Sequence, residues 1–193
     1  MNKKSYLLLL VTVLSVHDAQ AQFSFGARAG FTMTDVNQDF SKMKPGFQVG
    51  VVGDFTVAPI LSIQPAVLFA TQGWTYKSDP HEVTISMNYI QVPVHLQVKI
   101  DVNGPKLLVQ AGPYLSYGLG GKFKTKYDTQ SFKMGRDESD YKAIDYGLSG
   151  GAGIQFGNIQ IGIGYLLGIE NINNRTFWKE KNTGLSLALT YLF

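Results

Sequence analysis

The sequence predicts an all-β fold, an eight-stranded antiparallel up-and-down transmembrane β-barrel, and three observations carry this prediction. Eight segments of roughly 10 to 14 residues alternate between apolar and small or polar positions, which is the period of a strand with two different faces. The connections between these segments alternate between short and long. The chain also ends on strict alternation, in GLSLALTYLF at 184–193, where a soluble domain would usually fray.

The N-terminal residues predict export. Two lysines precede an apolar run over residues 6–16, which is followed by the small-residue pattern Ala-Gln-Ala at 19–21. The run is too short for a helix that crosses a bilayer, because such a helix needs about 20 residues. We therefore expect a signal peptide over residues 1–21 and an outer-membrane β-barrel domain over residues 22–193.

The expected mature chain has a small net charge and no cysteine. Removing residues 1–21 takes two lysines and one aspartate from the formal charge of +3 and leaves +2, so the charge demands no nucleic-acid partner. The lack of cysteine excludes a disulfide framework, a thiolate metal site and a catalytic cysteine. The many glycine, tyrosine, phenylalanine and β-branched residues favour strands over helices.

The first four predicted strands each separate a bulky apolar row from a row of small and polar residues. The apolar rows are Phe23, Phe25, Ala27, Ala29, Phe31 and Met33, then Phe47, Val49, Val51 and Phe55, then Leu61, Ile63, Val67 and Phe69, then Ile90, Val92, Val94, Leu96, Val98 and Ile100. The opposite rows include Ser24, Arg28 and Thr32, then Gln48 and Asp54, then Ser62, Gln64 and Gln72, then Gln91, His95, Gln97 and Lys99.

The last four predicted strands repeat this separation. Their apolar rows are Leu107, Val109, Leu115, Tyr117 and Leu119, then Tyr146, Leu148, Ile154 and Phe156, then Ile159, Ile161, Ile163, Tyr165, Leu167 and Ile169, then Leu185, Leu187, Leu189, Tyr191 and Phe193. The opposite rows include Gln110, Gly112, Tyr114 and Ser116, then Asp145, Ser149 and Gln155, then Gln160, Gly162, Gly164 and Glu170, then Ser186, Ala188 and Thr190.

The predicted connections alternate in length. Short ones lie at 57–59, 101–105 and 157–158, and long ones lie near 34–45, 73–84, 121–143 and 171–183. Short turns on one side and long loops on the other are typical of bacterial outer-membrane barrels, whose short turns face the periplasm. With an even strand count, both termini would lie on that side.

A lipocalin-like soluble barrel has the same strand number and period, so the choice depends on which row faces inward. The polar row is mostly glycine, serine and glutamine with isolated charges, which suits a narrow lumen better than a solvated surface. The apolar rows would then face lipid, and pairing of the last strand with the first would satisfy the backbone. Aromatic girdles near the interfaces would include Tyr117, Tyr146, Tyr165, Tyr191 and Phe193.

Several motifs resemble the PorT-like outer-membrane β-barrel family of Gram-negative bacteria. They are NYIQVPVHL at 88–96, AGPYLSYGL at 111–119, DYGLSGGAGIQF at 145–156, GYLLGIENI at 164–172 and the terminal YLF. The resemblance implies the barrel fold, the outer-membrane location and a link to protein secretion. It also implies that Tyr191 and Phe193 form the signal by which the barrel-assembly machinery recognises the chain. One departure is Gly164, where relatives are expected to carry a basic residue.

Catalysis and metal binding have weak support in the sequence. His95 would meet Ser116 or Asp145 only through a fortunate geometry, and no G-x-S-x-G stretch is present. The acidic cluster of Asp137, Glu138 and Asp140 is explained by a solvated loop. The glycine-rich runs at 118–121 and 147–153 lack the context of a phosphate loop and are interpreted as strand residues. We therefore expect no enzyme, no cofactor and no catalytic or metal site.

The inward charges give a more specific hypothesis. Arg28, Asp54, Lys99, Asp145 and Glu170 all fall on the predicted lumen face, where an enclosed charge needs a partner or water. We expect Arg28 to pair with Asp54 or Asp145, Lys99 to lie near the periplasmic rim, and the network to plug the interior.

The loop over 121–143 is rich in lysine and aromatic residues. It is interpreted as a solvated extracellular loop, with contact to anionic lipid headgroups, glycans or a partner protein as the alternative. The leading hypothesis is a non-enzymatic outer-membrane barrel with a structural, interaction or secretion-accessory role. A small porin-like pore or transporter is the second hypothesis, and a barrel enzyme that acts on lipid or peptide is the third.

Overall fold

The computed structural model describes residues 23–37, 41–78, 81–125, 127–135, 141–173 and 180–193, so the predicted signal peptide over 1–21 lies outside the described residues. The described residues form nine strands. They are β1 (Phe23–Val36), β2 (Ser41–Ala58), β3 (Leu61–Ser78), β4 (His81–Asp101), β5 (Lys106–Lys124), β6 (Thr129–Phe132), β7 (Ile144–Phe156), β8 (Ile159–Gly168) and β9 (Asn182–Leu192). No helix among the described residues is long and apolar enough to span a membrane.

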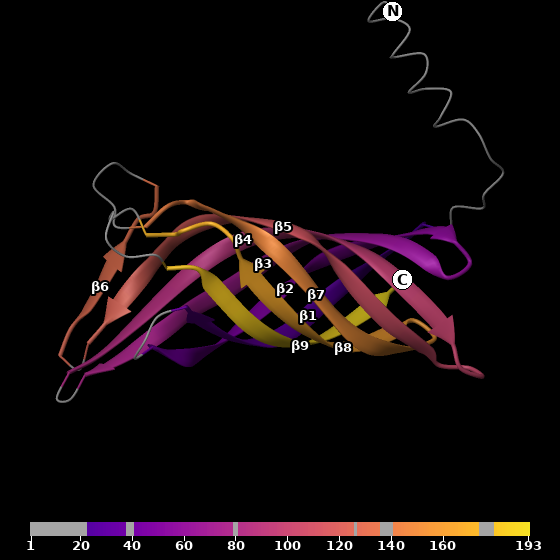
Figure 1. The fold of residues 1–193 in the computed structure, drawn as a ribbon, viewed down its shortest axis with the longest axis horizontal. Helices are drawn as coiled ribbons and strands as arrows, with labels where there is room; N and C mark the ends of the chain where they lie inside the picture. Colours follow the sequence, from indigo (N-terminus) through magenta and orange to yellow (C-terminus); the bar gives the residue numbers. More distant parts are fainter. Residues whose placement is uncertain (1–22, 38–40, 79–80, 126, 136–140, 174–179) are drawn as a thin grey trace, which may run out of the picture.

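Eight of these strands close an antiparallel barrel, which confirms the predicted fold class. Each strand pairs with its sequence neighbour in the ring, with β5 next to β7, and β1 pairs with β9 to close it. At this seam Arg28 lies opposite Thr190 and Phe31 lies opposite Leu187. Figure 1 shows the strands wrapped around one long axis, with the C-terminus at the end opposite to β6.

The bulky apolar row of each ring strand faces outward, as predicted. Phe31 is 75% exposed, whereas Arg28 on the opposite row of the same strand is only 7% exposed. A row of exposed Phe, Leu, Ile and Val around the whole barrel would be unfavourable in water but is favourable in hydrocarbon. The predicted girdle residues, among them Tyr117, Tyr165 and Phe193, are also exposed on this surface.

Two of the predicted long loops are wrong, because the strands continue through them. β1 and β2 remain paired as far as Thr34 opposite Lys44, and β3 and β4 remain paired as far as Ser78 opposite His81. β4 has 21 residues, whereas about 9 to 11 suffice for a strand to span a bilayer. The strand ends at the long-loop side therefore project beyond the membrane as an extended sheet.

The short connections lie where the sequence predicts them, at the other end of the barrel. β2 ends at Ala58 and β3 begins at Leu61, and β7 and β8 are separated by residues 157–158. In the turn between β4 and β5, Asn103 and Gly104 adopt positive φ angles of 60° and 125°, a backbone conformation that these two residue types tolerate.

The predicted loop over 121–143 is partly β-structure. β5 continues to Lys124, and β6 pairs with it from Gly121 to Lys124 along the same edge of β5 as β7, beyond the end of the β7 pairing at Tyr117. Figure 1 shows β6 standing at the extracellular end of the barrel. The part of the predicted loop over 171–183 that is described includes Asn173, which bridges to Tyr141.

The interior contains two apolar clusters among its polar side chains. The smaller one packs Val52, Ala66, Leu68 and Leu192 together. The larger one lies toward the extracellular end and comprises Val36, Trp74, Ile85, Met87, Tyr89, Met134, Tyr141 and Ile172. We call this larger cluster the apolar plug.

Candidate functional site

The lumen begins at its periplasmic end with an ion pair between β2 and β4. The Lys99 Nζ lies 2.7 Å from Asp54 Oδ2, and the two side chains are 11% and 3% exposed. Both residues face inward because they occupy the polar rows of their strands, and Lys99 lies two residues before the end of β4. This placement agrees with the prediction that Lys99 lies near the periplasmic rim.

Arg28 does not make the predicted direct pair with Asp54 or Asp145. Its Nη2 donates to the Gln64 side-chain oxygen, and its Nε donates to Thr190 Oγ1 at 2.9 Å. The amide nitrogen of Gln64 in turn donates to Asp54 Oδ2 at 3.0 Å. Asp54 is already paired with Lys99, so Gln64 stands between the guanidinium and the carboxylate as a neutral bridge.

Glutamine side chains form a layer above this ion pair. Gln64 Nε2 lies 3.2 Å from Gln160 Oε1, and Gln160 Nε2 donates to Gln155 Oε1 at 3.1 Å. Below the layer, a cavity of about 320 Å³ lined by Asp54 and Lys99 forms the periplasmic mouth. Above it, a second cavity of about 90 Å³ occupies the middle of the lumen. The glutamine layer therefore separates the mouth from the mid-lumen cavity.

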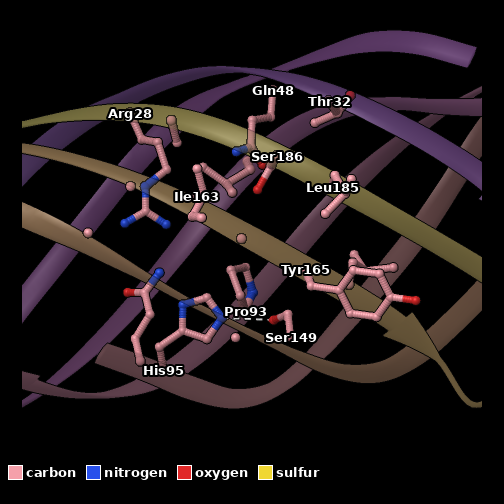
Figure 2. Close-up of a pocket in the computed structure, with 18 of the residues that line it drawn as sticks. Arg28, Thr32, Gln48, Pro93, His95, Ser149, Ile163, Tyr165, Leu185 and Ser186 are labelled. Carbon is pink, nitrogen blue, oxygen red and sulfur yellow. Dashed lines mark hydrogen bonds between the residues drawn. The ribbon is translucent and has the colours of Figure 1, made fainter. Parts of the chain in front are cut away.

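Arg28 and His95 face the mid-lumen cavity from different strands (Figure 2). The His95 Nε2 lies 2.7 Å from Ser149 Oγ, so its partner is not Ser116 or Asp145. The His95 Nδ1 is buried and has no hydrogen-bond partner in the described residues. Small residues make room for the cavity, since Gly162 and others on β7 to β9 carry no side chain into it.

Asp145 lies higher in the lumen and is fully buried. Its Oδ2 accepts hydrogen bonds from Asn182 Nδ2 at 2.9 Å and from the Tyr114 hydroxyl at 3.2 Å. Its Oδ1 has no side-chain partner in the described residues. The structure thus places Asp145 in a layer of neutral donors, apart from the Arg28 and Lys99 layer.

The apolar plug closes the lumen above Asp145. Trp74, Met87, Tyr89 and Ile172 are each completely or almost completely buried there. Two apolar interior residues of β3 and β4, Trp74 and Ile85, are opposite each other in the sheet register, so both face the same side. This packing resembles the core of a soluble domain and leaves little room for a water-filled channel.

The aromatic residues of the segment 121–143 contribute to this closure. Phe123 and Phe132 stack with ring centroids 4.4 Å apart, and Phe132 lies 5.5 Å from Tyr141 in the plug. Tyr127, in contrast, is 88% exposed. The interpretation of the whole segment as a solvated loop is therefore wrong for these three rings, which pack inward.

Glu170 lies beyond the end of β8 at the extracellular rim rather than inside the lumen. Lys142 donates a hydrogen bond to its carboxylate, which lowers the pKa of Glu170. Nearby, the Tyr76 hydroxyl donates to Glu180 Oε1 at 2.9 Å, while burial raises the pKa of Glu180. These pairs connect the segment before β9 to the projecting ends of β3 and β7.

A polar cationic face covers the outside of the projecting sheet. The register sets Lys42, Thr75, Thr84, Lys124 and Thr129 opposite one another across five strands, and residues that are opposite in a sheet share a face. A second row contains Ser86, Lys122 and Ser131. We call these eight residues the extracellular face.

The remaining predicted features have plain outcomes. The acidic cluster of Asp137, Glu138 and Asp140 lies outside the described residues. The glycine-rich runs at 118–121 and 147–153 lie in β5 and β7, as interpreted. Phe193 packs on Phe25 with ring centroids 5.1 Å apart, and its amide donates to the Phe25 carbonyl at 2.7 Å.

The bridging roles of Gln64, Gln160 and Thr190 were not predicted from the sequence, and neither were the contacts of Ser149 and Asn182. The alternating pattern places the first four of these on the inward face, but it does not show which inward side chains meet across the lumen. That information depends on strand stagger, which periodicity alone does not determine.

Comparison with known proteins agrees with this architecture. The family model described as outer membrane protein beta-barrel domain matches residues 18–174. Neisserial surface protein A has a similar structure, with 15% identity, a TM-score of 0.53, and coverage of 89% of this chain and 99% of that chain. At this level of identity the similarity shows the fold alone.

Two further solved structures were compared. Ail, the attachment invasion locus protein of Yersinia pestis, is 17% identical with a TM-score of 0.49, covering 89% of this chain and 99% of that chain. OprG from Pseudomonas aeruginosa is 12% identical with a TM-score of 0.49, covering 90% and 97%. No curated protein sequence matches the chain.

Proposed function

The chain belongs to the family of outer membrane protein β-barrel domains, and we propose that it serves there as a non-enzymatic interaction element whose lumen does not conduct. Its outward apolar rows lie in the lipid of the outer membrane, and its projecting sheet is presented outside the cell. The single observation that carries this proposal is the apolar plug, which fills the lumen directly below that sheet.

The plug supports an interaction role over a pore. A porin-type channel needs a continuous water-filled path, whereas here Trp74 and Met87 are fully buried across the extracellular end. The glutamine layer forms a second barrier between the periplasmic mouth and the mid-lumen cavity. Side chains that seal the inside also make the projecting sheet rigid, and a rigid surface loses less entropy when a partner binds.

The mid-lumen geometry supports a non-enzymatic role as well. His95 and Ser149 are within hydrogen-bond distance, as in a hydrolytic dyad. However, an orienting acid would have to accept a hydrogen bond from His95 Nδ1, and no described residue does so. The cavity of about 90 Å³ is also too small for an acyl chain or a peptide.

The extracellular face is the surface that we propose for the partner. Lys42, Lys122 and Lys124 are exposed on it and are flanked by hydroxyl side chains, so it is complementary to anionic groups on a protein or glycan. Among the described strands, β6 is paired only with β5, so its other edge lies beside this face without a strand partner. Following the resemblance of the motifs to the PorT-like branch, we propose that the partner is a component of a protein-secretion system.

Crosslinking in the native outer membrane tests this proposal. A photoreactive residue placed at Thr129 or Ser131, both exposed on the extracellular face, is expected to give a discrete adduct with a secretion component. The matched control is the same probe at Val109, which is exposed but faces lipid. Adducts with lipid alone at all three positions would contradict the proposed role.

Planar-bilayer recordings test the pore hypothesis. We expect the refolded protein to give no stepwise conductance, because both the plug and the glutamine layer cross the lumen. A reproducible single-channel conductance that is unchanged by substitutions at Trp74 would contradict the proposed closure and favour the porin-like alternative.

We also propose that Tyr191 and Phe193 direct the chain to the barrel-assembly machinery. Both side chains lie on the outward face of the last strand, and their rings contact each other at a centroid distance of 5.3 Å. An exposed terminal aromatic side chain is accessible to a recognition factor before the barrel closes.

A further inference from the structure

The mid-lumen cavity contains one cation, Arg28, that makes no ion pair with any described residue. Asp54 forms its ion pair with Lys99, and Gln64 separates it from Arg28. Among the described residues, the guanidinium donates only to the neutral oxygens of Gln64 and Thr190. Arg28, Lys99 and Asp54 together therefore carry a net charge of +1 within the barrel wall.

The other buried carboxylate of the lumen lies too far away to compensate. Asp145 bonds to Asn182, whereas Arg28 bonds to Thr190 on the same strand, β9. Eight residues separate these two partners, which corresponds to about 26 Å along an extended strand. An uncompensated charge that is 93% buried is unfavourable, since neither water nor an opposite charge fully replaces its hydration.

An unused donor of Arg28 and an unpartnered ring nitrogen of His95 face the cavity. Arg28 uses Nε and Nη2 for Thr190 and Gln64, which leaves Nη1 without a partner in the described residues. His95 uses Nε2 for Ser149, and its buried Nδ1 has no partner either. Figure 2 shows the guanidinium and the imidazole on facing sides of the same open space.

From this geometry we propose that the cavity between Arg28 and His95 binds a small monovalent anion of halide type. The anion accepts hydrogen bonds from Arg28 Nη1 and from His95 Nδ1, and it neutralises the net charge of the Arg28 layer. Binding selects the tautomer in which the Ser149 hydroxyl donates to Nε2 and the proton resides on Nδ1.

The size and lining of the cavity fit such an ion together with water. A volume of about 90 Å³ accommodates an ion of chloride size and a few water molecules, but no larger metabolite. Gln97, two residues from His95, also lines the cavity, and its buried Oε1 has no partner among the described residues. This acceptor needs water as a donor, so the ion would be partly hydrated rather than completely stripped.

Bromide soaks test the proposal directly. In crystals of the refolded protein, we expect an anomalous peak within hydrogen-bond distance of Arg28 Nη1 and His95 Nδ1, and we expect Arg28→Gln to remove it. Bromide peaks confined to the outer surface, with only water in the cavity, would overturn the proposal. A cavity peak that persists in Arg28→Gln would overturn it too.

Thermal unfolding in solution gives an independent measurement. Replacing gluconate, which is too large for the cavity, by chloride at constant ionic strength is expected to raise the wild-type Tm by about 3 °C at tenfold excess over Kd. His95→Phe keeps a ring but no donor, and it leaves the Arg28 contacts in place, so its chloride response should be clearly smaller. Equal chloride responses of the wild type and of His95→Phe would contradict the site, even if Arg28→Gln does not fold.

Discussion

Asp54 and Lys99 form an ion pair across the periplasmic end of the barrel, with Nζ 2.7 Å from Oδ2, while Arg28 is held off the same carboxylate by one glutamine. One acid thus serves two cations, one directly and one through an amide. A change at this carboxylate therefore affects both cations.

Replacing Asp54 by Asn should therefore destabilise the barrel strongly. The substitution leaves Lys99 and Arg28 buried without an opposite charge, and breaking a buried pair in this way costs about 3 kcal/mol or more. The gel shift of heat-modifiable folded protein should occur at a lower temperature. Asp101→Asn is the matched control, since Asp101 is exposed and accepts only a turn hydrogen bond. Equal shifts in the two variants would contradict this account.

Replacing Arg28 by Ala should also lower heat stability, for a different reason. The Gln64 oxygen and the Thr190 hydroxyl lose their donor, and a buried polar group without a partner costs about 1–3 kcal/mol. The loss is partly offset because the uncompensated charge disappears. Chemical denaturation in detergent measures the difference, and an unchanged midpoint would argue against a structural role for the guanidinium contacts.

Gly112 should not tolerate a methyl group. A Cβ at this position would lie 1.9 Å from the Val94 carbonyl oxygen on the neighbouring strand, so the backbone would have to shift. We expect Gly112→Ala to destabilise the barrel by about 1–3 kcal/mol. Gly162→Ala is the control, because its Cβ would lie 3.1 Å from the nearest atom and beside the cavity. Comparable melting temperatures for both variants would show that the close approach is not limiting.

The stability of the extracellular end should depend on Glu180. Burial raises the pKa of this carboxyl above its ordinary value of about 4.3, so the folded state binds the proton more tightly than the unfolded state. The contribution of Glu180 to stability therefore falls as the pH rises from about 4 through the raised pKa. Glu180→Gln keeps an acceptor for Tyr76 but removes the titration.

Unfolding curves of the wild type and of Glu180→Gln between pH 4 and pH 7 measure this dependence. The wild type should lose stability relative to the variant as the pH rises. Glu170 contributes a pH dependence of the opposite sign, because Lys142 lowers its pKa. The stability of the wild type is therefore compared with that of Glu180→Gln at each pH, since both proteins contain Glu170. Parallel curves would contradict the effect assigned to Glu180.

Replacing Phe193 by Ala should affect assembly more than stability. In refolded protein the lost contacts with Phe25 and Tyr191 amount to about 1–2 kcal/mol. In cells, the fraction inserted into the outer membrane should fall further if the ring is also a recognition element. Phe23→Ala, which loses a similar ring contact with Phe55, is the control. Equal insertion of the two variants would argue against an assembly signal.

The alternation of residue types was sufficient to predict the barrel and its orientation. β4, for example, carries Val92, Val94 and Leu96 on one side and His95 and Gln97 on the other. Because hydrocarbon surrounds the barrel, the apolar side has to face outward. The same pattern continues through Trp74 and Tyr76 on the inward side of β3. The segment 73–84 was nevertheless predicted as a loop, because the strand was expected to end before it.

The contacts inside the lumen were less predictable, for a physical reason. Periodicity tells which side chains face inward, but the height of each residue along the axis depends on the stagger between strands. Arg28 was therefore expected to meet Asp54 or Asp145, whereas the stagger places Gln64 between it and Asp54 and moves Asp145 to another layer. Glu170 was assigned to the lumen because β8 was expected to continue, but it ends at Gly168.

The pairing of β1 with β9 has a kinetic consequence. It joins residue 26 to residue 192, so the ring is incomplete until all eight of its strands have been delivered. Until then the edges of β1 and β9 remain unpaired, and they can form backbone hydrogen bonds with any other exposed strand nearby. Long sequence separation also makes this last step slow. Between export and insertion both edges are therefore open to mispairing, and the hydrogen bond from Arg28 to Thr190 forms only once β1 and β9 meet.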